Sequence, residues 1–369
     1  MSFDKYGKGY FDHRTLYQID RLYAWKNGLY FPPVVVEINP TSFCNQKCRY
    51  CYVAGRTSGK LEGNMLLRLL PQLANTGIKA IVFQGAGEPL LHDALPDSIE
   101  IGAEYNLSMT ITTNGVLLNQ KMQEKILKNL SYIKFSAIES NPQRYAYTHG
   151  CSEKQWEMLI ENIKNAIIIR EQNKLQILYI ATIYLTKDNF HDAYNIVKYF
   201  KEIGLDYISV QEAVYNKFSY TGSEELASSF FTANEINEMK SKISSLKDDG
   251  FFIKVRFPLN DINFINGRYQ DCWVNNWCNG IKFNTLINSD GEVYPCFRYW
   301  GMKDFSYGNI YEKSFEEIWK GEKRREVEKF TNNTPPNDDE CSTCNVTKIN
   351  AILYDLQNLS SNKWKDFLI

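Results

Sequence analysis

The chain has 369 residues, of which 44% are hydrophobic and 23% are charged, and this composition excludes a disordered or fibrous protein. Lys and Arg number 42 and Asp and Glu 43, so the net charge of −1 offers no basic surface for nucleic acid or an anionic membrane. The sequence has no apolar run of about 18 residues that could span a membrane, and its charged start lacks the apolar segment of a secretion signal. We therefore expect a cytoplasmic protein with two domains, or with one large domain and an appendage.

The predicted elements alternate between strand and helix over the first 211 residues. In chain order they are a strand at 34–38, a helix at 65–76, a strand at 79–84, a helix at 92–105, a strand at 108–112, a helix at 119–129, a strand at 132–136, a helix at 153–172, a strand at 176–184, a helix at 190–203 and a strand at 207–211. The strand sequences are mostly apolar on both faces, which is typical of parallel strands covered by helices. Since a closed barrel has about eight such units, six units predict an α/β fold of the partial, open (β/α)6 barrel type. Functional groups are expected in the loops after the strands' C-terminal ends.

The alternating pattern stops after the sixth strand, and a small cysteine-rich region follows a helix at 233–246. We expect the following division: an N-terminal extension at 1–33, the barrel at 34–225, a linker helix region at 226–264, an auxiliary domain at 265–350 and a C-terminal helix at 351–369.

Nine cysteines are the unusual feature of the composition. Their number is odd and nothing indicates export, so disulfides are not expected, and clustered thiols instead suggest metal or iron–sulfur ligands. Cys44, Cys48 and Cys51 form a compact group with gaps of three and two residues. Three thiolates leave one position open on a [4Fe–4S] cluster, whereas a structural zinc site takes four ligands. The alternatives are a zinc site with a missing ligand and a set of buried thiols.

The pattern Cys44-x3-Cys48-x-Tyr50-Cys51 after the first strand resembles the radical SAM superfamily. The resemblance implies that the three cysteines hold a [4Fe–4S] cluster whose open iron binds S-adenosylmethionine (SAM). It also implies that an electron donor such as a flavodoxin or ferredoxin reduces the cluster. Reductive cleavage of SAM would then give a 5′-deoxyadenosyl radical that takes a hydrogen atom from the substrate.

The loop after the second strand carries the second match to this superfamily. Its Gly-Gly-Glu-Pro motif is matched by Ala86, Gly87, Glu88 and Pro89, with Ala86 in place of the first glycine. Such a loop must bring backbone and a carboxylate close to the ammonium group of the methionine moiety, and small residues permit that approach.

Further cofactor contacts are implied at the ends of later strands. They are Thr113, Asn114, Ser136 and Gln211. The turn at 113–115 could equally be a plain Asn-Gly turn, and a surface position is an equal alternative for Gln211. Ser136 is followed by Ala137 and Ile138, so the acid that the superfamily often carries at this point is absent or displaced.

The second cysteine group begins with a predicted hairpin. Cys278 and Cys296 flank the turn at 288–291, and Cys341 and Cys344 form a Cys-x2-Cys pair. Four thiolates suit either zinc or a cluster without an open iron. The spacing resembles the SPASM and Twitch auxiliary domains. Because no cysteine follows Cys344, the resemblance implies the shorter Twitch form with one auxiliary [4Fe–4S] cluster.

Two cysteines remain outside both patterns. Cys272 could be a buried thiol, a substitute ligand or a catalytic hydrogen-atom donor, and Cys151 is expected to be a packed thiol.

The resemblance also suggests the reaction. Twitch relatives include an aminocyclitol dehydrogenase, and radical SAM relatives include sugar epimerases. Only 43 residues precede Cys44, too few for the N-terminal peptide-binding domain that peptide-modifying members often carry. We therefore expect oxidation or epimerisation of a small polar metabolite, with modification of a peptide or protein as the first alternative. A non-catalytic iron–sulfur or zinc protein is the alternative of another class.

Overall fold

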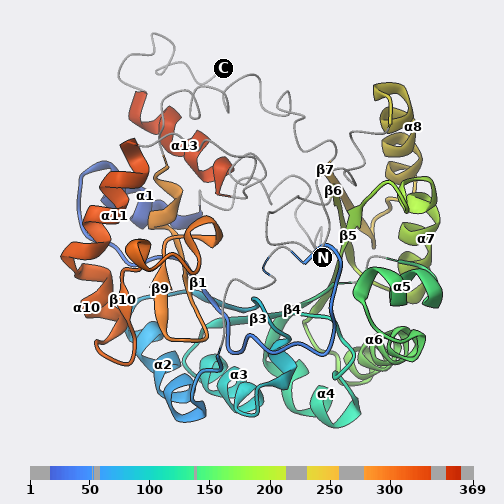
Figure 1. Cartoon of the computed structure of the whole chain (residues 1–369), viewed down its shortest axis with the longest axis horizontal. Coiled ribbons are helices and arrows are strands. Elements are labelled where there is room, and N and C mark those ends of the chain that lie inside the picture. Colours follow the sequence, from blue (N-terminus) through green and yellow to red (C-terminus); the bar gives the residue numbers. More distant parts are fainter. Residues whose placement is uncertain are drawn as a thin grey trace.

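The computed structural model of the chain describes residues 17–51, 53, 59–136, 139–212, 231–256, 278–333 and 346–358. Within these residues ten strands form one sheet that curves into an open arc, with helices along its convex side (Figure 1). In the same ranges no helix is both long enough and apolar enough to cross a membrane.

Seven strands of the sheet run parallel and follow the order of the chain. They are β1 Val35–Ile38, β2 Ala80–Phe83, β3 Ser108–Thr113, β4 Leu130–Phe135, β5 Leu178–Leu185, β6 Tyr207–Glu212 and β7 Phe252–Arg256. The six strands expected from the sequence all form, and β7 adds a seventh that the sequence analysis did not predict. The α/β fold with a partial, open barrel is confirmed.

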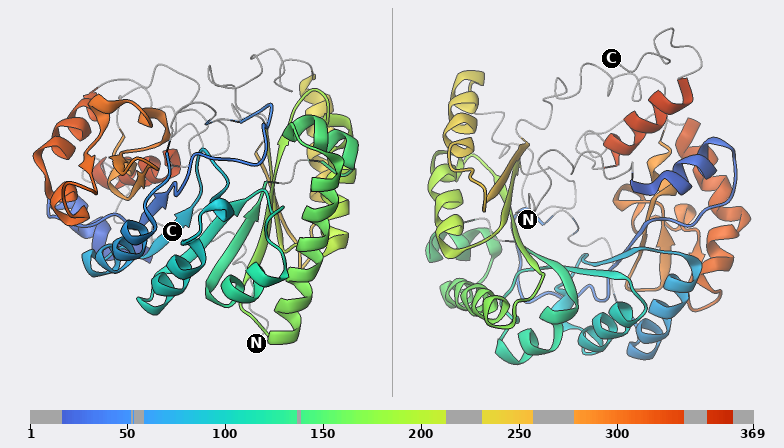
Figure 2. Two further views of the ribbon diagram at one scale, coloured as in Figure 1. Left: turned by 60° about the horizontal axis from the view of Figure 1, so that its bottom comes forward. Right: turned by 180° about the vertical axis from the view of Figure 1, so that it is seen from behind.

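Helices cover the convex face of these strands (Figures 1 and 2). They are α2 Gly63–Thr76, α3 Leu95–Glu104, α4 Gln120–Ile126, α5 Pro142–His149, α6 Glu153–Asn173, α7 Ala193–Ile203 and α8 Ala233–Ser244. Three of them end at a glycine in the left-handed conformation: Gly77 after α2 with φ of 100°, Gly150 after α5 with φ of 57° and Gly204 after α7 with φ of 104°. These glycines stop the helices because they adopt positive φ without steric cost.

A hairpin from the C-terminal part of the chain extends the sheet beyond β1. β8 (Asn284–Ile287) pairs parallel with β1, β9 (Glu292–Tyr294) returns antiparallel to β8, and β10 (Gly308–Asn309) pairs with β9. The strand order is therefore β10-β9-β8-β1-β2-β3-β4-β5-β6-β7. The predicted hairpin forms, and Gly291 takes a φ of 86° in its turn. Its pairing with the barrel was not anticipated, and the expected domain boundaries stay a prediction.

Four further helices accompany the hairpin. They are α1 Ile19–Lys26, α10 Phe315–Lys320, α11 Glu322–Asn333 and α13 Thr347–Asn358. α1 packs against α13, and α10 packs against α2 of the barrel. The C-terminal part of the chain is thus attached to the barrel both through the sheet and through helix packing.

Successive strand residues divide the sheet into an apolar outer face and a more polar inner face. Val36, Ile38, Ile81 and Phe83 are fully buried in the core that the outer helices cover. The intervening positions, which side-chain alternation directs to the concave side, include polar residues on several strands. They are Glu37, Thr112, Lys134, Ser209 and Gln211. The inner face is therefore less apolar than we expected, because the helices that the structure describes along these strands lie on the outer face (Figure 1).

A buried ion pair joins α6 to the residue directly before β6. It gives a test of the fold. Arg170 pairs with Asp206, whose carboxylate also accepts a hydrogen bond of 2.7 Å from the backbone N–H of Tyr179. We expect Asp206→Ala to lower the free energy of unfolding by about 3–5 kcal/mol, because it leaves a buried guanidinium without its carboxylate. Thermal unfolding followed by circular dichroism measures the effect.

The matched control for this variant is Glu202→Ala, which removes an exposed ion pair with Lys198 on α7. Its effect should be no more than about 1 kcal/mol. Equal midpoints for the two variants would contradict the assigned role of the Arg170–Asp206 pair.

Candidate active site

Three loops meet where β1, β2 and β3 end. The loop after β1 begins at Asn39 and carries Cys44, Cys48 and Cys51. The loop after β2 spans residues 84–88, and the turn after β3 contains Asn114. Because the strands are parallel neighbours, their carboxyl ends lie at one edge of the sheet. The sequence analysis predicted this juxtaposition, and the structure brings the three loops into direct contact.

The first contact is a close approach of backbone between the cysteine loop and the loop after β2. The N–H of Glu88 donates a 2.9 Å hydrogen bond to the carbonyl oxygen of Phe43. A Cβ atom on Gly87 would stand 2.3 Å from the carbonyl oxygens of Thr41 and Phe43, so only glycine fits there. Gly85, with φ of 154°, likewise leaves no room for a side chain beside Asn39.

The carboxylate of Glu88 makes the second contact. Glu88 is buried, and its Oε1 accepts hydrogen bonds from Thr113 Oγ1 at 2.6 Å and from the N–H of Leu90 at 3.0 Å. Its Oε2 accepts a 2.8 Å bond from the N–H of Asn114. Burial raises the pKa of the Glu88 carboxyl, and these three donors oppose that rise. The carboxylate we expected to face a ligand ammonium is thus already engaged in joining the loops after β2 and β3.

Asn114 completes the connection back to the cysteine loop. Its side-chain Nδ2 donates a 2.7 Å hydrogen bond to Oδ1 of Asn45, which directly follows Cys44. Its own Oδ1 accepts from the N–H of Val116 at 3.1 Å. Asn114 is therefore held in one orientation, and the turn at 113–115 is more than a plain Asn-Gly turn.

The three thiols of the cysteine loop lie close enough to influence one another electrostatically. Burial, followed by the charges of Glu88 and Cys51, raises the pKa of the Cys44 thiol to about 11. Burial, and then Cys51 and Cys44, raise the pKa of Cys48 well above its usual value. Without a cation beside them, these groups stay protonated thiols.

The donor set fits a cluster better than a single ion. Among the described residues, no three His, Cys, Asp or Glu side chains are placed to hold one metal ion. Thiolates of a [4Fe–4S] cluster each bind a different iron, so they stand farther apart than the ligands of one ion. A cationic cluster would also lower the raised thiol pKa values, as a bound metal does for any coordinating thiol.

A buried polar network contacts Cys48. It joins the cysteine loop to side chains from the end of α5 and the start of α6. Nδ1 of His149 lies 3.3 Å from Sγ of Cys48 and 3.0 Å from Oε1 of Gln46. The Gln46 Nε2 group donates to the hydroxyl of Tyr145 at 3.0 Å and to Oε1 of Gln155 at 3.0 Å. Burial lowers the pKa of His149 to about 3, so its imidazole is neutral. The sequence analysis missed this network, because residues about 100 positions apart carry no local signal.

The other predicted cofactor residues lie around this edge. Ser136 follows β4, and its N–H donates to the carbonyl oxygen of Thr113 at 2.9 Å. Gln211 lies on the inner face of β6, opposite Tyr184 of β5. Tyr50 is half-buried, and Pro89 is buried at the start of a short 3₁₀ turn. Ser136 thus contacts the turn after β3, whereas Gln211 lies three strands beyond β3, and each assigned role stays a prediction.

The inner face carries polar residues that the sequence analysis did not select. Glu37 on β1 accepts hydrogen bonds from Gln84 after β2 and, at 2.9 Å, from Asn284 on β8. Gln84 in turn accepts from Thr112 of β3 at 3.1 Å. Burial raises the pKa of Glu37, while its amide donors and the charge of Lys134 oppose the rise. The sequence signal for this site was Glu37, a charged residue within the otherwise apolar run at 34–38.

Cys278 and Cys296 lie at the other end of the β8–β9 hairpin. Both thiols interact electrostatically with the phenol of Tyr307, which is buried and whose hydroxyl has no hydrogen-bond partner in the described residues. Asn350 of α13 donates to Sγ of Cys278 at 3.4 Å. An orphaned buried hydroxyl beside two thiols fits a site that holds a further group with sulfur acceptors.

Cys341, Cys344 and the candidate hydrogen donor Cys272 lie outside the described residues. Val346, two positions beyond Cys344, packs so closely on Gly280 that a Cβ there would stand 2.0 Å from its Cγ1. The chain next to the Cys-x2-Cys pair therefore returns to the neighbourhood of Cys278.

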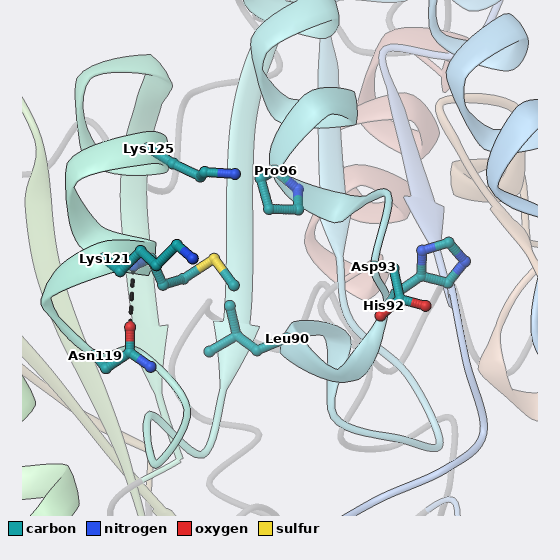
Figure 3. A pocket seen from close by; sticks show the side chains of 8 residues that line it. Leu90, His92, Asp93, Pro96, Asn119, Lys121 and Lys125 are labelled. Carbon is teal, nitrogen blue, oxygen red and sulfur yellow. Dashed lines mark hydrogen bonds between the residues drawn. The ribbon is translucent and has the colours of Figure 1, made fainter.

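A separate cavity of about 310 Å³ lies on the outer rim between α3 and α4 (Figure 3). It is lined by Leu90, His92, Asp93, Pro96, Asn119, Lys121, Met122 and Lys125. Asn119 caps α4 through a 3.1 Å bond from the N–H of Met122. Nε2 of His92 lies 2.8 Å from the carbonyl oxygen of Leu61 and is hydrogen-bonded to it.

Comparisons with known proteins agree with this arrangement. Residues 38–200 match the model of the radical SAM superfamily, and residues 278–345 match SPASM, an iron–sulfur cluster-binding domain. The chain is similar to the tungsten-containing aldehyde ferredoxin oxidoreductase cofactor-modifying protein of Pyrococcus furiosus, with 23% identity over 308 residues that cover 77% of this chain and 80% of that protein.

Two further relatives cover most of the chain. The cysteine-type anaerobic sulfatase-maturating enzyme of Clostridium novyi is 23% identical over 330 residues, which cover 83% of each protein. The solved structure of Streptococcus suis SuiB bound to the precursor peptide SuiA has a TM-score of 0.66 at 17% identity, covering 96% of this chain and 79% of SuiB. This likeness establishes the shared fold.

The close approach at Gly87 gives a test of the site. In Gly87→Ala the new Cβ would collide with backbone oxygens of Thr41 and Phe43, which cannot move aside as a side chain would. We expect a loss of about 1–3 kcal/mol in stability and a lower iron content after reconstitution. Gly250→Ala is the control, because its nearest atom, Oδ1 of Asp248, is 3.7 Å away. Equal iron content in the two variants would contradict the tight packing assigned to this loop.

Proposed function

We propose that this chain, which belongs to the radical SAM superfamily and carries a C-terminal SPASM iron–sulfur domain, modifies a peptide or protein through a substrate radical. The observation that carries the proposal is the contact between the three-cysteine loop and the loop at 84–88 at one edge of the sheet. A [4Fe–4S] cluster bound there supplies the electron that splits SAM into methionine and a 5′-deoxyadenosyl radical. The protein's part is to bind, orient and shield.

Cys44, Cys48 and Cys51 would hold this cluster through their thiolates. Three ligands leave the fourth iron for SAM, and the half-buried positions of Cys48 and Cys51 limit access of water. Glu88 positions the site by fixing the turn at 113–115 against the loop after β2. Backbone groups of the glycine-containing loop and the side chains of Ser136 and Gln211 are the groups we assign to SAM.

The auxiliary cluster is assigned to Cys278, Cys296, Cys341 and Cys344. The first two lie beside the orphaned hydroxyl of Tyr307, and Val346 brings the chain beyond Cys344 back to Gly280. We propose one auxiliary cluster on these four cysteines, within the region that matches the SPASM domain. A role for Cys272 as a hydrogen-atom donor stays a prediction.

A protein substrate replaces our first expectation of a small metabolite. That expectation rested on the length of the chain before Cys44, which carries no argument about the substrate. The Clostridium novyi relative is named for the maturation of a sulfatase, and 83% of its own length aligns with this chain. A relative whose name gives a protein as its target therefore has little sequence outside the region that it shares with this chain. The SuiB structure with its precursor peptide supports the same choice through its fold.

A small-molecule substrate is the second candidate, favoured by the relative from Pyrococcus furiosus that is named as cofactor-modifying. The polar inner face, with Glu37 and Lys134 on neighbouring parts of the sheet, suits polar groups of either substrate class. The cluster sites need a low-potential electron donor, for which we propose a flavodoxin or ferredoxin. Free thiols and reducible clusters suit the reducing cytoplasm.

Anaerobic reconstitution with iron and sulfide, followed by SAM and dithionite, tests the reaction. We expect about eight irons per chain in the wild type and about four in the variant Cys44→Ala/Cys48→Ala/Cys51→Ala. The wild type should release 5′-deoxyadenosine and the triple variant should not, because only the first cysteine group leaves an iron open for SAM. Wild-type protein without dithionite is the control. Bound zinc and no 5′-deoxyadenosine would favour a non-catalytic metal-binding protein.

Deuterium transfer tests the substrate class. Cells grown in deuterium oxide supply two substrate pools, a proteolytic digest of their proteins and their small-molecule fraction. We expect deuterium to enter 5′-deoxyadenosine from the peptide pool, because the radical takes a hydrogen atom from the carbon it attacks. Mass spectrometry of the isolated nucleoside measures the transfer. Enrichment from the small-molecule pool alone would overturn the peptide assignment and restore the metabolite as substrate.

A further inference from the structure

His149 is a buried side chain that contacts Cys48 from outside the cysteine loop. It ends α5, and the chain around it is fixed to the loop by backbone bonds: the N–H of Lys47 donates to the carbonyl oxygen of His149 at 3.0 Å, and the N–H of Arg49 donates to that of Thr148 at 2.9 Å. The imidazole stacks on the ring of Tyr145, with centroids 4.0 Å apart. His149 is 1% exposed, so its position relative to Cys48 is set by packing on all sides.

A chain of amide groups determines which ring nitrogen carries the proton. The carbonyl oxygen of Asn45 accepts from Nε2 of Gln155 at 3.4 Å, so Oε1 of Gln155 faces Gln46. Nε2 of Gln46 donates to that oxygen, which turns Oε1 of Gln46 toward Nδ1 of His149. A carbonyl oxygen only accepts, so Nδ1 of the neutral ring must be the protonated nitrogen. Nε2, which has no hydrogen-bond partner among the described residues, is the bare nitrogen.

The same N–H group lies within reach of the sulfur of Cys48. Nδ1 is 3.3 Å from Sγ and 3.0 Å from the Gln46 oxygen, a geometry in which one N–H is shared by two acceptors. A thiolate bound to iron can accept a hydrogen bond and cannot donate one. Hydrogen bonds to the sulfurs of a cluster stabilise the extra negative charge of its reduced form.

We infer that His149 is a positioning residue that donates an Nδ1–H hydrogen bond to the cluster-bound sulfur of Cys48 and makes this cluster easier to reduce. The inference rests on the proposed function, because it needs a cluster on Cys44, Cys48 and Cys51. The reduction it favours adds one electron from the external donor to the cluster and moves no proton. The hydrogen bond therefore changes the reduction potential of the cluster and takes no part in the reaction of the substrate.

The test compares His149→Leu, which has no donor, with His149→Asn, whose side-chain N–H group can occupy the place of Nδ1. Midpoint potentials are measured on the reconstituted full-length chain by redox titration with electron paramagnetic resonance, without SAM. The spectrum of the Cys44→Ala/Cys48→Ala/Cys51→Ala variant supplies the auxiliary signal for subtraction. We expect a more negative midpoint in His149→Leu and recovery toward the wild-type value in His149→Asn.

Tyr145→Phe is the matched control, because it keeps the stacked ring and leaves the His149 N–H in place. Its midpoint should equal that of the wild type. Iron counts separate the possible failures. If the wild type assembles no cluster at the first cysteine group, the proposed function is wrong. If His149→Leu assembles the cluster with an unchanged midpoint, the inference about His149 is wrong.

A second measurement covers the case in which His149→Leu does not load iron. The chain has four histidines, and all can be labelled with nitrogen-15 in the wild type. Pulsed electron paramagnetic resonance on the reduced cluster should then show a nitrogen-15 coupling, which the control Tyr145→Phe retains. Absence of this coupling in the wild type would overturn the inference without any variant of His149.

Discussion

The buried carboxylate of Glu88 is the constraint on which the rest of the site depends. A carboxylate taken from water costs several kcal/mol unless donors replace its hydration. Here Thr113, Asn114 and Leu90 supply those donors. Two of the three come from the end of β3, so the loop after β2 cannot adopt its structure until β3 is in place. Asn114 in turn donates a hydrogen bond to Asn45, so it also restrains the cysteine loop.

A second constraint is the contrast between the two faces of the sheet. The outer face holds the strands to the helices through fully buried residues such as Ile38 and Phe83. The inner face is free to carry groups that an apolar core would reject. Glu37 is tolerated there because the amides of Gln84 and Asn284 donate to it. The fold thus separates the residues that stabilise it from those available for binding.

The sequence predicts what local patterns encode and misses what only distant contacts create. The order of strands and helices, the helix ends at Gly77 and Gly204, and the loops that carry the cysteines follow from periodicity and spacing. The pairing of β8 with β1 joins strands about 250 residues apart in the chain. It could not be predicted, because no local pattern specifies which strand pairs with which. The same applies to the contact of His149 with Cys48. Glu88 lies at the predicted place, and its role at a bound cofactor stays a prediction.

The parallel pairing of β8 with β1 also fixes where the two cysteine groups stand. Cys44 to Cys51 follow the carboxyl end of β1, whereas Cys278 precedes the amino end of β8. β9 returns antiparallel, so Cys296, which follows it, lies at the same amino edge as Cys278. Among the described residues, cysteines of the two groups therefore lie beyond opposite ends of paired strands, with Glu37 hydrogen-bonded to Asn284 between them. Residues beside both groups nevertheless meet over the sheet, because Val53 and Phe297 pack against the same cluster of Leu286, Tyr294 and Trp300. This contact joins the cysteine loop after β1 to the hairpin that carries Cys296.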